Sequence, residues 1–149
     1  MREQTKDQSL NAATVMLALS DEGALDYLQN ILRFIDCDVH IPESVEDFQR
    51  LAQRFSDRSI SVFVSSQLPD ETRSSFLSAI NEMSPRPALI QVHEKEGDEM
   101  LLSGDVLATL RLPCHYDAIS SLLHKAQVFD ESQRHGEAPR RPLELFRSL

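Results

Sequence analysis

A short apolar run near the middle of the chain, Ile60–Ser66, limits the folds open to this sequence. The run is rich in β-branched residues, ends in serine, and is bounded by the polar stretches 57–59 and 67–69. Such a run is typical of a strand buried on both faces of a parallel sheet. Open α/β sheets place their chemistry at the carboxyl ends of their strands. We therefore expect Ser65 and Ser66 to stand where a functional site would lie.

The composition argues against several classes of function. The chain has 149 residues, which fits one domain, and its formal net charge of −9 disfavours direct contact with nucleic acid or anionic lipid. It holds no apolar run long enough to span a membrane, and its charged N-terminus lacks the apolar core of a signal peptide. Cys37 and Cys114 form neither a CxxC pair nor a metal-ligand spacing. We therefore predict free thiols and a cytoplasmic protein.

Short apolar runs alternate with amphipathic helical patterns along the chain. Strands are predicted at residues 14–19, 37–41, 60–66, 88–92 and 106–112, and helices at 22–35, 45–55, 70–83 and 115–132. A further helix between 93 and 103 would be short and weakly held, because that stretch is strongly charged. Ser44 with Asp47 resembles a capping box, and Asp70 after Pro69 is a candidate N-cap.

Five strands alternating with five helices predict an α/β fold, a doubly wound parallel sheet with helices on both faces. The polar alternation of residues 37–41 suits an edge strand, so the flavodoxin-like order 2-1-3-4-5 fits best. We expect a disordered tail at 1–12, one domain at 13–132 and a linker at 133–149. The apolar end of that linker suggests that the sequence was cut from a longer chain.

This order of elements resembles the receiver domains of two-component response regulators, which have the CheY fold. A receiver needs an acidic pair after strand 1, an aspartate at the end of strand 3, a hydroxyl after strand 4, and a lysine before a proline after strand 5. The aspartate is the nucleophile, the acidic pair holds magnesium, and the lysine and the hydroxyl bind the phosphoryl oxygens.

The corresponding positions in this sequence are Ser20 and Asp21, Ser65, Val92, and Leu112 before Pro113. Only Asp21 keeps its functional group, and one carboxylate is a poor magnesium site because that ion requires several oxygens in octahedral array. No base is evident beside Ser65, and the acidic residues of Glu94–Glu96 suggest solvated charge. We therefore predict a pseudo-receiver that accepts no phosphate, with a degenerate pocket, no catalytic residue and no metal site.

Three segments near the C-terminus carry a closer resemblance: Leu112–Tyr116, Leu122–Phe129 and Leu145–Leu149. They are similar to the N-terminal part of FleQ/FlrA, the flagellar master regulators among the NtrC-class bacterial enhancer-binding activators. The resemblance implies an AAA+ ATPase domain after Leu149 and then a DNA-binding helix-turn-helix domain. It also implies ATP as a cofactor of the parent protein, homodimerisation, and sigma-54 RNA polymerase and a FleN/FlhG-type ATPase as partners.

In this family the LFRS segment that joins receiver and ATPase domain contributes to binding cyclic di-GMP. That segment maps to Leu145, Phe146, Arg147 and Ser148. A guanidinium can fork onto phosphate or the Hoogsteen edge of guanine, and it can stack on the base. Because the other ligands would lie in the ATPase domain, we expect little or no nucleotide binding by these residues alone, and no cofactor in this chain.

Two other functions stay open at this point. One is a working phosphorelay receiver with an atypical acceptor, and the other is a small flavodoxin-like nucleotide binder. The nucleotide binder lacks a glycine-rich phosphate loop, since the chain has four glycines and none forms GxGxxG. His40 and His93 are expected on an edge strand and in a loop, and His115 and His124 lie at no ligand spacing, so we assign them no metal.

Overall fold

The computed structural model describes residues 13–95, 97, 100, 102 and 105–136. Its elements, in chain order, are β1 (Thr14–Ala18), α2 (Glu22–Phe34), β2 (Asp38–His40), α3 (Val45–Arg54), β3 (Ile60–Ser65), α4 (Asp70–Asn81), β4 (Ala88–His93), β5 (Ala108–Arg111) and α5 (Tyr116–Gly136). The strands form one parallel sheet in the order β2-β1-β3-β4-β5, which confirms the predicted fold. No helix in the described part of the chain has the length and apolar character needed to cross a membrane.

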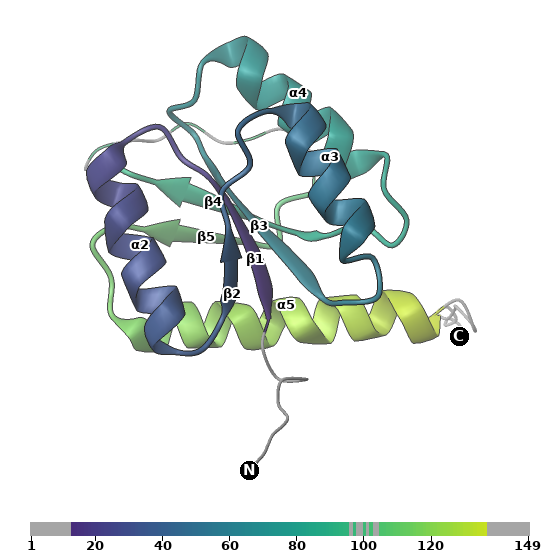
Figure 1. Cartoon of the computed structure of the whole chain (residues 1–149). Helices are drawn as coiled ribbons and strands as arrows, with labels where there is room; N and C mark the ends of the chain where they lie inside the picture. Colours follow the sequence, from purple (N-terminus) through teal and green to yellow (C-terminus); the bar gives the residue numbers. More distant parts are fainter. Residues whose placement is uncertain (1–12, 96, 98–99, 101, 103–104, 137–149) are drawn as a thin grey trace.

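Strand β3 lies at the centre of the sheet, between β1 and β4, and every one of its residues is buried. Its side chains alternate between two layers of core. Val62 and Val64 pack in the layer of helices α3 and α4, whereas Phe63 packs in the layer of α2 and α5. Figure 1 shows these two pairs of helices on opposite sides of the sheet. Burial on both faces explains why the centre of this strand is apolar.

The connection between β4 and β5 differs from the predicted five-helix pattern, since none of its described residues is helical. Gln91 of β4 binds this connection: its side chain accepts the N–H of Leu102 at 3.0 Å and donates to the carbonyl of Met100. Leu102 is buried in the layer of α3 and α4. Because the stretch is strongly charged, it has little apolar surface with which packing could stabilise a helix.

The starts of α3 and α4 agree with the predicted caps only in part. Ser44 Oγ accepts the N–H of Asp47 at 3.0 Å, as in a capping box, but the Asp47 carboxylate accepts the N–H of Glu43 at 2.9 Å instead of that of Ser44. Asp70 is not the N-cap of α4, because it is itself the first residue of the helix. Its carboxylate pairs with Arg73 at 2.7 Å.

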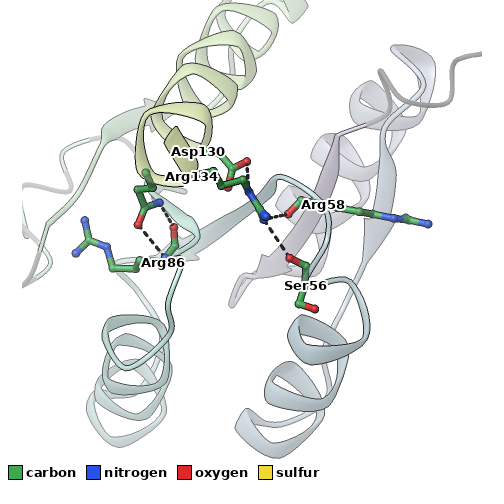
Figure 2. A network of polar contacts seen from close by, with 6 residues as sticks. Ser56, Arg58, Arg86, Asp130 and Arg134 are labelled. Carbon is green, nitrogen blue, oxygen red and sulfur yellow. Dashed lines mark hydrogen bonds and ion pairs between the residues drawn. The ribbon is translucent and has the colours of Figure 1, made fainter. Parts of the chain in front are cut away.

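Helix α5 continues beyond its predicted end at residue 132. Figure 2 shows its last turns beside the segments that lead into β3 and β4. The Arg134 guanidinium donates to the carbonyls of Ser56 and Arg58 at 3.1 and 3.0 Å, and it pairs with Asp130 at 2.8 Å. These bonds attach the end of α5 to the segment that leads into β3.

A second attachment joins α5 to the segment before β4 (Figure 2). The Gln133 side chain accepts the N–H of Arg86 at 2.9 Å and donates to the Arg86 carbonyl at 2.6 Å. The Arg86 guanidinium lies 5.7 Å from the ring centroid of Phe129 and pairs with Asp105 at 2.9 Å. Residues that the sequence assigned to the start of a linker therefore form the end of the last helix.

The central position of β3 predicts a large difference between two phenylalanines. Phe63 is fully buried, whereas Phe34 is 76% exposed at the end of α2. Phe63→Ala removes a buried ring and should lower the free energy of unfolding by about 3–5 kcal/mol. Phe34→Ala should lower it by less than about 1 kcal/mol, since it loses only exposed surface and one edge contact with Tyr116. Urea unfolding measures both, and equal losses would contradict this account of the core.

Candidate functional site

The predicted pocket positions lie at the carboxyl edge of the sheet. Ser65 ends β3 and is paired in register with Val92 of β4. Ser20 and Asp21 follow β1 and lead into α2, and Leu112 follows β5 directly. Because the strands are parallel, all of these positions are brought to one end of the sheet, where open α/β folds bind their ligands. We call this region the strand-end corner.

Glu94, which directly follows β4, occupies the strand-end corner. Its Oε1 accepts the hydroxyls of Ser20 and Ser65, at 2.5 and 2.6 Å. Its Oε2 accepts the main-chain N–H groups of Ser20 and Asp21, each at 3.0 Å. The prediction that Glu94 is solvated charge is therefore wrong. Its place one residue past β4, at the carboxyl edge of the sheet, follows from the strand order, whereas its own charged surroundings in the sequence give no signal.

The Ser65 hydroxyl both donates and accepts a hydrogen bond, and the residue has no exposed surface. Its Oγ donates to Glu94 at 2.6 Å and accepts the N–H of Gln67 at 2.9 Å. The expectation that no base lies near Ser65 is wrong, since a carboxylate oxygen is in hydrogen-bond range of it. However, Ser65 Oγ is itself buried and in contact with that carboxylate, so a phosphodonor cannot reach it unless Glu94 moves.

Asp21 acts as the N-cap of α2. Its Oδ2 accepts the N–H of Ala24 at 2.9 Å, which places the carboxylate against the positive end of the helix dipole. This geometry assigns the one acidic residue of the predicted pocket to helix capping. Among the residues that the structure describes, no group of three or more histidine, cysteine, aspartate or glutamate side chains is arranged to hold a metal ion.

Val92 and Leu112 bring hydrocarbon to positions where a receiver uses a hydroxyl and an ammonium group. Val92 is fully buried in the layer of α2 and α5, and its carbonyl accepts the N–H of Ser66 at 3.2 Å. Leu112 packs against the same layer, and its main-chain N–H donates to the His93 carbonyl at 3.1 Å. Neither side chain can bind a phosphoryl oxygen.

The side chains of Cys37 and Cys114 pack against the core, and His93 is buried. Burial, with Asp36 and Asp38 beside it, raises the pKa of the Cys37 thiol to about 11, and burial also raises the pKa of Cys114. A raised pKa makes the nucleophilic thiolate scarce at neutral pH. His93 was expected in a loop, but it is the last residue of β4 and only 2% exposed.

A hollow of about 370 Å³ lies at the opposite end of the sheet, where α3 and α4 end beside the last turns of α5. Three arginines line it, and Figure 2 shows Arg134 between Arg86 and Arg58, whose side chains point away from each other. Each has an acidic partner: Arg58 pairs with Asp38 at 2.9 Å, Arg86 with Asp105 at 2.9 Å and Arg134 with Asp130 at 2.8 Å. These guanidinium groups hold segments of the fold together.

The residues predicted to contact cyclic di-GMP, Leu145, Phe146, Arg147 and Ser148, lie outside the described residues. The strand-end corner is therefore the predicted site whose geometry the structure provides. There the Glu94 carboxylate accepts hydrogen bonds from hydroxyl and main-chain donors.

Solved receiver domains share this fold. FixJ-N is 17% identical with a TM-score of 0.63, and the match covers 79% of this chain and 95% of that one. The signal receiver domain of an HD domain-containing protein from Pseudomonas fluorescens Pf-5 is 20% identical with a TM-score of 0.61, covering 82% and 99%. The N-terminal domain of a response regulator/sensory box/GGDEF 3-domain protein from Carboxydothermus hydrogenoformans is 11% identical with a TM-score of 0.64, covering 83% and 99%.

These likenesses confirm the predicted receiver fold and, at such low identity, concern the fold alone. No curated protein matches the chain. A family model does: residues 14–128 match the family described as flagellar regulatory protein FleQ. The match spans every strand and most of α5.

Proposed function

Because the chain belongs to the family of the flagellar regulatory protein FleQ, as its C-terminal segments predicted, we propose that it is a regulatory domain that works without phosphorylation. The family and the receiver fold together support a regulatory domain of a flagellar regulator. The finer proposal concerns how such a domain is controlled. In a receiver the control is a phosphoryl group on the strand-end acceptor, and here that acceptor position holds Ser65.

The observation that carries the proposal is the hydrogen bond from Ser65 Oγ to Glu94 Oε1 at 2.6 Å, made by a serine with no exposed surface. A phosphoserine carries about −1.5 to −2 charge at neutral pH, so its formation would place two anions in contact. At the position where a receiver has a lysine to bind the phosphoryl group, this chain has Leu112, and Asp21 caps α2.

We propose that regulation instead arrives at the segment after α5. There Leu145, Phe146, Arg147 and Ser148 would form half of a cyclic di-GMP site, completed by the AAA+ domain of a longer parent protein. A ligand at that junction can shift the placement of the two domains only by its differential affinity for the two arrangements. ATP, sigma-54 RNA polymerase, a FleN/FlhG-type ATPase and a second copy of the chain would be partners of the cytoplasmic parent.

One observation favours a second function. The Glu94 carboxylate is in range to accept the proton of Ser65, which is the arrangement that a serine acceptor would need. A working receiver with an atypical acceptor is therefore the competing hypothesis. It requires Glu94 to uncover Ser65 Oγ to a phosphodonor and yet stay in range to take its proton.

Treatment with a small phosphodonor and magnesium separates these two functions. We expect no phosphoryl adduct by intact mass on the 149-residue chain, because Ser65 is buried and faces an anion. A receiver domain with an intact acceptor aspartate serves as the positive control. A phosphoryl adduct that appears on the wild-type chain and is lost in Ser65→Ala would establish the atypical receiver and overturn the proposed function.

Calorimetry with cyclic di-GMP tests the proposed route of control, on a version of the protein that continues through an ATPase domain. Arg147→Ala should weaken binding by about 10- to 100-fold, the effect of losing hydrogen bonds to a charged group. Arg140→Ala, in the same segment but outside the motif, should bind as wild type. Equal affinity in wild type and Arg147→Ala would remove this site from the account.

A further inference from the structure

The Glu94 carboxylate joins three separate parts of the chain. Ser20 and Asp21 come from the turn between β1 and α2, Ser65 comes from the end of β3, and Glu94 itself begins the connection from β4 to β5. A carboxylate offers about four acceptor sites, and these residues supply four donors, two hydroxyls and two main-chain N–H groups. The carboxylate is thus fully bound by protein groups that we call the cradle.

The contact fixes the first residue of a connection that has few other attachments among its described residues. Further along, Gln91 binds Leu102 and the Met100 carbonyl, and Leu107 N–H donates to the Leu89 carbonyl at 2.8 Å. Between β4 and the Gln91 contacts, Lys95 and Gly97 are exposed. Glu94 therefore decides where the first part of the connection leaves the sheet.

The two sides of the cradle differ in burial. Ser65 has no exposed surface, whereas Ser20 and Asp21 are exposed and Glu94 is half-buried. Water can therefore replace the donors of Ser20 and Asp21 more easily than it can replace the Ser65 hydroxyl. A charged group that is partly solvated and held by exchangeable hydrogen bonds can leave and return, unlike one that is sealed in the core.

We propose that Glu94 is a latch: a built-in carboxylate ligand that binds the cradle, holds the turn after β1 against the end of β3 and fixes where the chain leaves β4. Glu94 is a positioning residue, because it acts through the connection that it anchors. When the latch opens, the cradle presents to solvent two hydroxyls and two main-chain N–H groups of the turn before α2, a donor set suited to a small carboxylate. This proposal goes beyond the proposed function, because the latch belongs to the unmodified chain and does not depend on what binds the segment after α5.

The test uses amide hydrogen exchange by NMR on the whole chain. In Glu94→Ala, the amides of Ser20 and Asp21 should exchange at least about tenfold faster, because they lose their acceptor. The thermal midpoint should fall by about 5 °C. Glu71→Ala, which removes the same charge from the exposed first turn of α4, should leave the exchange of these two amides unchanged.

Acetate then distinguishes a carboxylate cradle from a general loss of structure. Sodium acetate should raise the thermal midpoint of Glu94→Ala saturably and slow the two amides, whereas sodium chloride at equal ionic strength should not. Wild type should show no such response, because its cradle is filled. Glu94→Gln should remain impaired, since its amide nitrogen would face donors.

Unchanged exchange in Glu94→Ala, or an equal acetate response in wild type and variant, would overturn the latch. If Glu94→Ala does not fold, Ser65→Ala decides the question. It removes one donor from the buried side, and the latch predicts faster exchange at Ser20 and Asp21, which lie on another segment. No change at those amides would contradict the proposal.

Discussion

Strand β3 carries apolar side chains into two core layers at once, and this decides where polar chemistry can occur in the molecule. Val62 and Val64 serve one layer and Phe63 the other, so the strand has no face left for water. Its first buried hydroxyl at the carboxyl edge is Ser65, which must find a hydrogen-bond partner because it has no exposed surface. The Glu94 carboxylate is that partner, and its charge in turn draws Ser20 and Asp21 into the same contact.

The outcome is a receiver fold whose strand-end corner contains a fixed internal anion. A phosphorylated receiver brings charge to the end of the third strand and lets neighbouring groups respond to it. In this chain the Glu94 carboxylate follows β4 and the Ser65 hydroxyl ends β3. A hydrogen bond therefore joins the ends of these two strands without any modification. The control proposed for Leu145–Ser148 acts outside the strand-end corner, so it requires no phosphorylation of Ser65.

Much of this fold could be predicted from sequence because its patterns are local. The apolar run at β3 and the polar alternation at β2 fixed the strand order, and periodic apolar residues located α2, α3, α4 and α5. Glu94 could not be found in that way, because a charged residue in a charged stretch has the same local pattern whether it is solvated or bound. Its partners Ser20 and Ser65 are 74 and 29 residues away. Between β4 and β5 no described residue is helical, and there the Gln91 side chain, from β4, binds the Leu102 N–H and the Met100 carbonyl, which local sequence patterns do not predict.

The contact between Ser65 and Glu94 is the centre of this account, and a double-mutant cycle measures it most directly. The free energies of unfolding of wild type, Ser65→Ala, Glu94→Ala and the double variant give the coupling between the two side chains. The account predicts a coupling of about 1–3 kcal/mol, as for a hydrogen bond to a charged group. Effects that add to within about 0.5 kcal/mol would show that the two side chains do not interact, and would contradict it.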